Sequence, residues 1–196
     1  MNAHPKIILG SRSPRRAEIM GYFALPFLQE ASDFDEDALP FLDNPEYYVN
    51  QLSKGKAKII QQRYPEDIII TADTIVYKSG KIYGKPRDEE DAFRSFQELV
   101  GEWHTVYTGV TVSYQKKTYQ QVEATRVLFN PLTPEQIRHY IARTEWADKA
   151  AGYAIQMAGG LIVKKIEGCY YNVMGLPINT VEALLKKVGI ELWDYL

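Results

Sequence analysis

Ile68-Ile69-Ile70-Thr71-Ala72-Asp73-Thr74-Ile75-Val76-Tyr77 is the stretch that decides the fold class of this 196-residue chain. Its first half is an almost continuous apolar run, which is typical of a strand buried on both faces at the centre of an α/β sheet. Asp73 interrupts the run and is therefore a carboxylate inside a buried strand. Burying a carboxylate is costly unless it is paired, hydrogen-bonded or bound to a metal. Three alternatives follow for Asp73: a structural salt bridge or capped strand end, a catalytic role, or a metal ligand.

Predicted helices and strands alternate on both sides of this stretch. Before it, the patterns predict strand, helix, strand and helix at Lys6–Leu9, Pro14–Phe23, Phe27–Ala31 and Pro45–Arg63. After it, they predict a hairpin at Gly80–Tyr83, a helix between Asp88 and Gly101, two long strands at Trp103–Tyr114 and Thr118–Phe129, a helix from Thr133, a strand ending the glycine-rich segment Gly152–Val163, and a last helix after Gly175-Leu176-Pro177. This order favours an α/β fold, a mixed sheet with helices on both faces.

A basic, serine-rich segment, Ser11-Arg12-Ser13-Pro14-Arg15-Arg16, follows the first predicted strand. Ser13 suits the N-cap and Pro14 the first position of the helix that begins there. A helix N-terminus ordinarily favours acids, so three arginines at this place need another explanation. Bare backbone N–H groups and guanidinium groups together suit a phosphate. A solvated basic turn is the alternative.

Lys56 falls inside the apolar stripe of the helix predicted at Pro45–Arg63. The stripe consists of Val49, Leu52, Ile59 and Ile60, which recur at helical spacing. A lysine there either extends its ammonium group to the surface or points into a polar cleft, and base rates favour the first.

Composition and charge exclude several classes of function. Hydrophobic residues make up 45% of the chain and charged residues 24%, as is usual in globular proteins. The net charge of −2 gives no overall electrostatic field that would attract nucleic acid or a membrane. One cysteine, Cys169, fits a reducing compartment, and Met1–Lys6 does not open a signal peptide, so we expect a cytoplasmic protein.

The chain has no Walker A loop and no GxGxxG. The histidines, His4, His104 and His139, lack zinc-site spacing, and His104 is predicted to be structural.

The residues that remain combine cations with acids: Arg12, Arg15, Arg16, Lys56, Lys85, Asp35, Glu36 and Asp73. Cations can hold phosphates, and carboxylates can hold a hard metal ion or activate water. The combination predicts metal-assisted hydrolysis of a phosphate anhydride.

Several segments, taken in order, resemble one family, the Maf nucleoside triphosphate pyrophosphatases. The resemblance covers residues 6 to 188 and rests on Ile8–Arg16, Asp35-Glu36, Lys54-Gly55-Lys56-Ala57, Ala72–Val76, Gly84-Lys85-Pro86, Gly101–Gly109, Ala151–Gln156 and Tyr171–Pro177. It implies the fold of the inosine triphosphate pyrophosphatase superfamily, with residues 1–196 forming a single domain in which a bent mixed sheet and two lobes surround a cleft. It also implies a possible homodimer.

The resemblance implies hydrolysis of a nucleoside triphosphate to the monophosphate and pyrophosphate with a divalent cation, Mg²⁺ or Mn²⁺. Asp73 matches the proton acceptor that activates water, and Lys56 and Lys85 match catalytic cations of the phosphate cleft. Glu36, with Asp73, matches an acid near the metal. The expected phosphate-binding residues are Ser11, Arg12, Ser13 and Arg16.

Three positions separate the subgroups of the family, and here they are Arg15, Thr74 and Gln156, which resembles the subgroup that hydrolyses dTTP and UTP. The Gln156 amide can both donate and accept, as the edge of uracil or thymine requires, and should reject cytosine. Met157 departs from the family pattern, which has glycine there, and could narrow the base pocket or pack against it. The alternatives are the same chemistry on modified or other nucleotides, or a nucleotide-sensing regulator of cell division.

Overall fold

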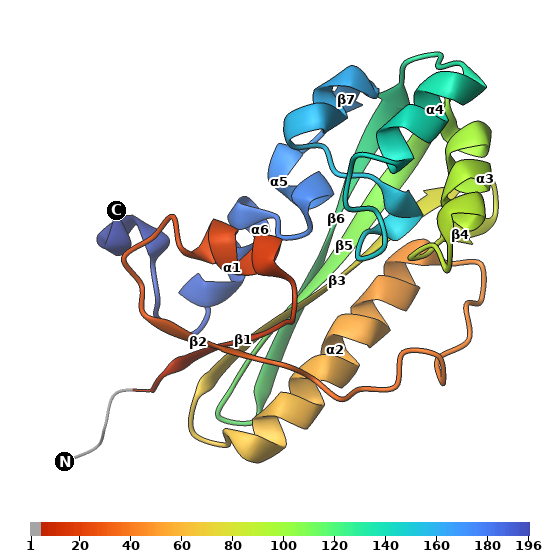
Figure 1. Cartoon of the computed structure of the whole chain (residues 1–196). Helices are drawn as coiled ribbons and strands as arrows, with labels where there is room; N and C mark the ends of the chain where they lie inside the picture. The colour runs from red at the N-terminus through yellow and green to blue at the C-terminus, as the bar shows by residue number, and fades with distance from the viewer. Residues whose placement is uncertain (1–4) are drawn as a thin grey trace. The chain divides into compact units, whose positions relative to one another are not determined.

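The computed structural model describes residues 5–196, which form a mixed, unclosed sheet flanked by helices (Figure 1). The strands are β1 (Ile7–Gly10), β2 (Phe27–Glu30), β3 (Ile68–Lys78), β4 (Lys81–Tyr83), β5 (Trp103–Tyr114), β6 (Lys117–Phe129) and β7 (Val163–Glu167). The helices are α1 (Pro14–Met20), α2 (Pro45–Arg63), α3 (Glu89–Leu99), α4 (Pro134–Ile141), α5 (Tyr170–Met174) and α6 (Ile178–Lys186), with 3-10 turns η1 (Ala150–Gly152), η2 (Met157–Leu161) and η3 (Leu192–Tyr195). The predicted α/β class is confirmed.

The strand order is β2-β1-β3-β5-β6-β7, and β4 pairs with β3 outside this path. β1 runs parallel to both neighbours, so that Ile7 lies opposite Phe27 and Ile68. β4 and β7 pair antiparallel with β3 and β6, which makes the sheet mixed. Each residue from Ile68 to Ala72 is at most 1% exposed. The apolar run is therefore a central strand, as predicted.

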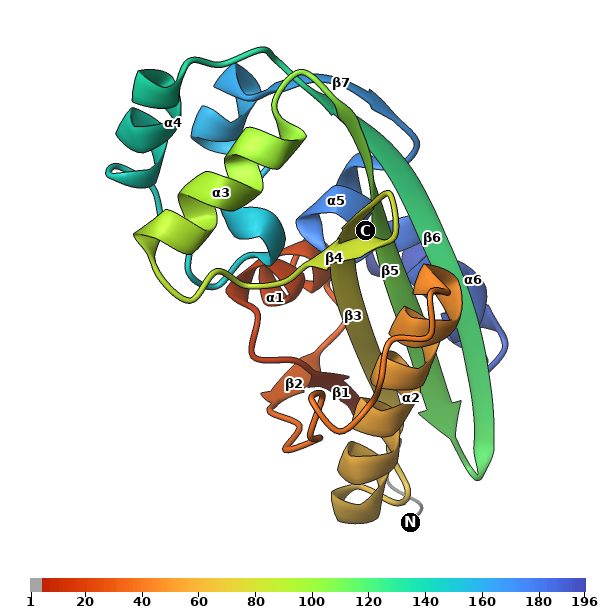
Figure 2. The ribbon, with the colours of Figure 1, turned by 90° about the vertical axis from the view of Figure 1, so that its right-hand side faces the viewer.

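The structure divides into two compact units, and β3, β5 and β6 each run from one unit into the other. The first unit comprises the described residues up to Asp73, together with Thr108–Glu123 and Gly175–Leu196. Within it, α2 covers one face of the strands, and α1 and α6 lie on the other (Figures 1 and 2). The bend of the sheet and the cleft between lobes stay predictions.

Close contact between α2 and β5 in the first unit depends on Gly109. A Cβ atom there would lie 2.4 Å from the carbonyl oxygen of Val49 and 2.9 Å from the backbone nitrogen of Asn50. Because backbone atoms cannot turn aside as a side chain can, only glycine allows α2 this approach. A buried cluster formed by Ile8, Ala57, Ile60 and Ile69 ties α2 to β1 and β3.

The second unit comprises Thr74–Tyr107 and Ala124–Met174 and has its own aromatic core. The rings of Phe96 and Phe129 stack with centroids 6.0 Å apart, and α3 packs against α4 and η1. α4 begins with a capping box in which Thr133 and Gln136 each bind the other's backbone N–H group. The helix predicted from Thr133 is thereby confirmed.

Some predicted boundaries were wrong. α1 ends at Met20 instead of Phe23, because Gly21 caps it. α5 and the three 3-10 turns were not predicted, since segments this short carry little periodicity. His4 and most of Met1–Lys6, the segment predicted not to open a signal peptide, lie outside the described residues.

Candidate active site

Lys56 and Asp73 form a buried ion pair in the first unit. The Lys56 Nζ atom contacts Asp73 Oδ1 directly, and their side chains are 12% and 9% exposed. The same Nζ atom lies 2.8 Å from Glu36 Oε1, whose side chain is 51% exposed. The favoured prediction that Lys56 reaches the surface was therefore wrong, because an acid on the neighbouring strand holds its ammonium group inside. Its alternative, a polar environment, is the one observed.

Asp73 combines a salt bridge with a raised pKa. Burial raises the pKa of the Asp73 carboxyl, and the positive charges of Lys56 and Arg16 oppose the rise. A carboxyl group with a raised pKa is a stronger base than an exposed aspartate once it is ionised. The salt bridge that the sequence allowed as a structural explanation is present, and a catalytic or metal-binding role for Asp73 stays a prediction.

Arg16 ties together three segments of the first unit. Its Nε atom donates to the carbonyl oxygen of Gly175 at 2.7 Å, and Nη1 donates to that of Ala72 at 2.7 Å. Nη1 also lies 3.4 Å from Ser11 Oγ. Burial lowers the pKa of Arg16, and the negative charge of Asp73 opposes this effect. The guanidinium group thus contributes a fixed positive charge beside the acid.

The turn between β1 and α1 is held by a residue that the sequence analysis missed. Gln29 Nε2 donates to the carbonyl oxygen of Ser11 at 2.9 Å and to that of Ser13 at 3.3 Å. Ser13 occupies the N-cap position, but its side chain makes no capping hydrogen bond. Its backbone N–H group instead donates to Ser11 Oγ at 3.1 Å. Ser13 and Pro14 thus occupy the N-cap and the first turn as predicted, and Ser11 helps to fix the turn.

The arginines of the basic segment do not share one environment. Arg12 pairs with Asp33 at 3.3 Å, and both side chains are about three-quarters exposed. Arg15 is half-buried and close enough to Arg16 to help lower the pKa of that guanidinium group. Arg12 therefore occupies the solvated position that was the alternative for this segment, whereas Arg16 lies beside Asp73.

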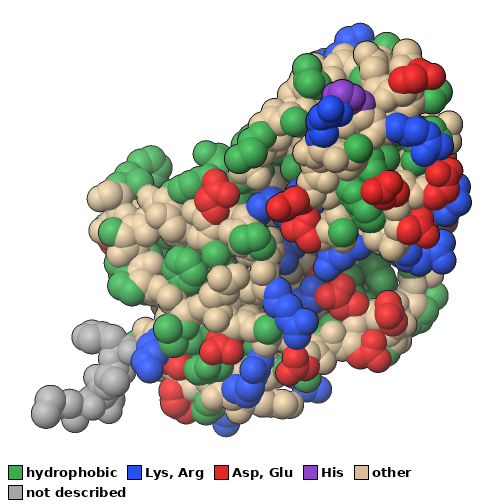
Figure 3. All heavy atoms as spheres, in the orientation of Figure 1, with side chains coloured by type: hydrophobic (Ala, Val, Ile, Leu, Met, Phe, Trp, Pro, Cys, Tyr) green, Lys and Arg blue, Asp and Glu red, His purple; other side chains and the backbone are tan. Residues whose placement is uncertain are grey.

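Charged side chains of both signs lie interspersed on the face shown in Figure 3. This agrees with the near-zero net charge. Any electrostatic attraction for a ligand is therefore expected to be local.

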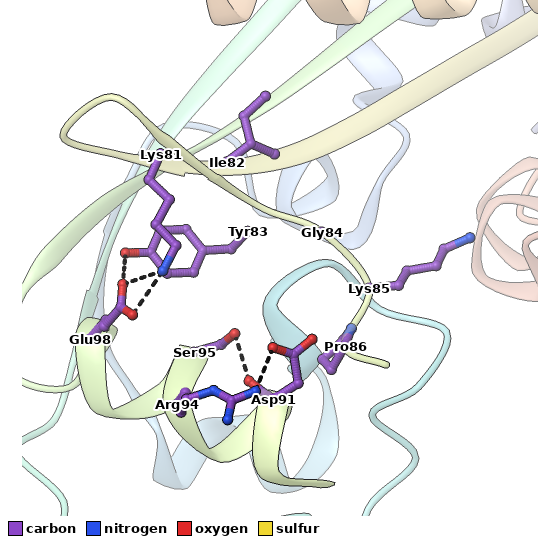
Figure 4. Close-up of a pocket in the computed structure, with 10 residues that line it drawn as sticks. All are labelled: Lys81, Ile82, Tyr83, Gly84, Lys85, Pro86, Asp91, Arg94, Ser95 and Glu98. Atoms are coloured by element: carbon purple, nitrogen blue, oxygen red, sulfur yellow. Dashed lines mark hydrogen bonds and ion pairs between the residues drawn. The ribbon is translucent and has the colours of Figure 1, made fainter. Parts of the chain in front are cut away.

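Lys85 belongs to the second unit and lines a cavity of about 170 Å³. In this cavity Lys81 and Tyr83 point toward Glu98, whereas Lys85 points away from that group (Figure 4). Lys81 Nζ lies 2.7 Å from Glu98 Oε2, so the Lys81 charge is paired. Lys85 is thus separate from the Lys81–Glu98 pair.

Thr74 and Gln156 are also grouped with the second unit. Thr74 directly follows Asp73 in β3, and the Gln156 carbonyl accepts from Gly159 N at 2.9 Å at the start of η2. Met157 has φ = 51° and is 98% exposed, so it packs against nothing. The left-handed backbone explains why the family pattern has glycine at this position. That Thr74, Lys85 and Gln156 face the same substrate as Asp73 stays a prediction.

His104 is structural, as predicted. Its Nε2 atom lies 2.9 Å from the Tyr153 hydroxyl, and its ring meets Phe129 edge-on with centroids 4.7 Å apart. Burial, aided by the charge of Lys78, lowers the pKa of His104 to about 3. The imidazole is therefore neutral near pH 7 and does not act as an acid.

The donor set around Lys56 suits a hard divalent cation bound together with a substrate. No group of three or more His, Cys, Asp or Glu side chains that could hold a metal occurs within the described part of the chain. The carboxylates of Glu36 and Asp73 do meet at one ammonium group. Mg²⁺ is commonly held by one or two carboxylates plus substrate phosphates, so these two oxygen ligands fit it.

Among residues 5–196, no helix has the length and apolar character needed to cross a bilayer. The sequence matches the family described as Maf-like protein over residues 6–188. A dTTP/UTP pyrophosphatase of Chlamydia felis is 42% identical over 193 residues, 98% of both chains. A dTTP/UTP pyrophosphatase of Clostridium perfringens is 43% identical over 190 residues, 95% of this chain and 99% of the relative. One of Chlamydia trachomatis is 37% identical over 192 residues, 97% of this chain and 98% of the relative. With its fold and these matches along nearly its whole length, the chain belongs to the Maf family.

Proposed function

We propose that this protein is a nucleoside triphosphate pyrophosphatase that hydrolyses dTTP and UTP to the monophosphate and pyrophosphate. The buried Lys56–Asp73 pair carries the proposal, because it places a base beside fixed positive charge in a chain whose relatives bear the name dTTP/UTP pyrophosphatase. Water attacks the α-phosphorus, a new P–O bond forms, and the bond between the α-phosphorus and the bridging oxygen breaks. Pyrophosphate leaves with that oxygen.

Asp73 is the general base in this mechanism. Lys56 binds Oδ1 and so fixes the carboxylate, and we assign the proton of the attacking water to Oδ2. The raised pKa of Asp73 increases its basicity, and the positive charges of Lys56 and Arg16 oppose the rise and so favour the ionised carboxylate. The proton then passes from Asp73 to solvent and the base is regenerated.

Glu36 and Asp73 would hold Mg²⁺ or Mn²⁺ together with substrate phosphates. When bound, the ion supplies positive charge that stabilises the transition state of phosphoryl chemistry. Lys56, Lys85 and Arg16 add positive charge along the triphosphate. The remaining proposed phosphate ligands are Ser11, Arg12 and Ser13, which requires Arg12 to exchange its exposed partner Asp33 for phosphate.

Arg15, Thr74 and Gln156 are the proposed determinants of the base. The Gln156 amide matches the donor and acceptor pattern of uracil or thymine, and the amino group of cytosine reverses one of these pairs. A buried polar group left unpaired is costly, so CTP should be a poor substrate. The resemblance also predicts a homodimer in the cytoplasm, and light scattering of the purified protein would test the dimer.

The testing experiment is pyrophosphate release from dTTP, UTP, CTP, GTP, 7-methyl-GTP and ITP with Mg²⁺ or Mn²⁺, beside an Asp73→Asn variant. We expect turnover of dTTP and UTP that is lost in the variant while nucleotide binding remains. Turnover of a different or modified nucleotide would keep the mechanism and refute the roles of Arg15, Thr74 and Gln156. Absence of turnover with every nucleotide would favour a nucleotide-sensing regulator, and full activity of Asp73→Asn would refute the base.

A further inference from the structure

Gly55 lies in the middle of α2, where glycine is intrinsically less favourable than alanine. The structure supplies a reason for it. A Cβ atom on Gly55 would lie 2.4 Å from both Cε2 and Cζ of Phe34 and 2.8 Å from Cδ2. The Phe34 ring therefore occupies the space of the missing methyl group and touches the bare helix backbone.

Phe34 is one of several residues that hold a loop without regular secondary structure, which also makes the Arg12–Asp33 ion pair and the Phe41–Tyr48 ring contact. The segment 31–44 contains neither helix nor strand. The hydrogen bonds of Phe34 N to Ser32 Oγ at 3.2 Å and of Asp37 N to Asp35 Oδ1 at 3.2 Å are local to the loop. Residues 35–38 are exposed, whereas Phe34 is half-buried. The loop thus reaches α2 through Phe34 at this point.

The Phe34–Gly55 contact and the Glu36–Lys56 ion pair join the same two segments, the loop and α2, at neighbouring positions in the sequence. Glu36 follows Phe34 by two residues, and Lys56 follows Gly55 by one. The Lys56 side chain of this pair is 12% exposed and the Glu36 side chain is 51% exposed. The ring contact and the ion pair therefore both bear on the position of Glu36, and the ring contact brings the loop to the backbone of α2.

We propose that Phe34 and Gly55 are a positioning pair that places the Glu36 carboxylate beside Lys56 and Asp73. Neither residue touches the reacting atoms, so their effect is transmitted through Glu36. The consequence for divalent-cation binding rests on the proposed function, whereas the consequence for the loop does not. Phe34 and Gly55 would then affect the concentration of divalent cation that half-maximal turnover requires.

The test is Gly55→Ala, which improves helix propensity and at the same time displaces the Phe34 ring. We expect the melting temperature to stay equal or rise, while amide hydrogen exchange in residues 31–44 becomes at least about fivefold faster. The Mn²⁺ concentration for half-maximal turnover should rise at least about threefold, because Glu36 is no longer held in place. Lys58→Ala, at an exposed position of the same helix, is the control and should change neither the exchange nor the Mn²⁺ requirement.

A compensating variant makes the test sharper. Leucine has no atoms equivalent to Cε2 and Cζ, so Phe34→Leu combined with Gly55→Ala removes the closest clashes. The double variant should lie closer to the wild type than Gly55→Ala in both exchange and Mn²⁺ requirement. Unchanged exchange in Gly55→Ala would overturn the proposal, as would faster exchange throughout α2 with a lower melting temperature. Should the wild type hydrolyse no nucleotide, the exchange result still decides whether the pair holds the loop.

Discussion

Replacing His104 with glutamine should remove a strong pH dependence of stability. The His104 side chain is buried, with the residue 3% exposed, and its pKa is lowered to about 3. In the unfolded chain a histidine has a pKa of about 6.5. As the pH falls below 6.5, the unfolded chain therefore takes up a proton that the folded protein does not, and unfolding becomes more favourable.

The size of the effect follows from the two pKa values. The stabilisation associated with neutral His104 is fully present above pH 6.5 and is lost as the pH falls toward 3. Between pH 7 and pH 5, protonation of the unfolded state lowers the free energy of unfolding by about 2 kcal/mol. A glutamine at this position does not titrate, so the wild type loses this amount relative to the variant.

Urea unfolding of both proteins at pH 7, 6 and 5 measures the difference directly. The wild type should be the more stable at pH 7, and its advantage over His104→Gln should shrink by about 2 kcal/mol at pH 5. His139→Gln, at an exposed position of α4, is the control. An advantage that stays constant across this range would show that His104 binds a proton in the folded state and would refute the reasoning.

Three further predictions concern the site and its scaffold. Lys56→Met should lower the free energy of unfolding by about 3 kcal/mol in urea titrations, because it leaves the Asp73 charge unpaired. Adding Asp73→Asn should recover more than half of this loss. No recovery would show that Lys56 stabilises the protein by packing. Gly109→Ala should lower the free energy of unfolding by about 3 kcal/mol in thermal unfolding, because its Cβ atom meets the α2 backbone. Gly160→Ala, whose Cβ atom would have no neighbour within 4 Å, should lower it little. Equal losses would contradict the close-approach argument. EDTA should abolish pyrophosphate release without moving the urea midpoint, since the described residues hold no group of three metal ligands, and a lower midpoint would reveal a structural metal.

The elements with the longest patterns could be predicted from the sequence. α2 has the predicted bounds, Pro45–Arg63, because Asn44 caps it and Pro45 fits its first turn. β5 has the predicted bounds as well, and β3 continues through Asp73 as its apolar residues indicated. Local chemistry and periodicity were sufficient in these three cases.

Contacts between distant segments could not be predicted in the same way. The helical stripe gives the face on which Lys56 lies, but it says nothing of an acid on the adjacent strand that holds the ammonium group. Gln29 binds the turn after β1 from β2, and the pattern that predicts this strand does not indicate the contact. Gly55 belongs to one of the motifs that carry the resemblance, but its contact with Phe34 forms only in the folded protein. Each of these features arises from tertiary packing.

The charges around Asp73 also bear on the divalent cation that we propose for this site. Lys56 and Arg16 carry two positive charges, and Glu36 and Asp73 carry two negative charges, so the cluster is neutral as a whole. A neutral cluster gives little attraction for a triphosphate, and its buried ion pair is costly to maintain without a role. A divalent ion held by Glu36 and Asp73 would supply two further positive charges for the phosphates. The same residues would thereby couple substrate binding to the metal, while Lys56 keeps Asp73 in place.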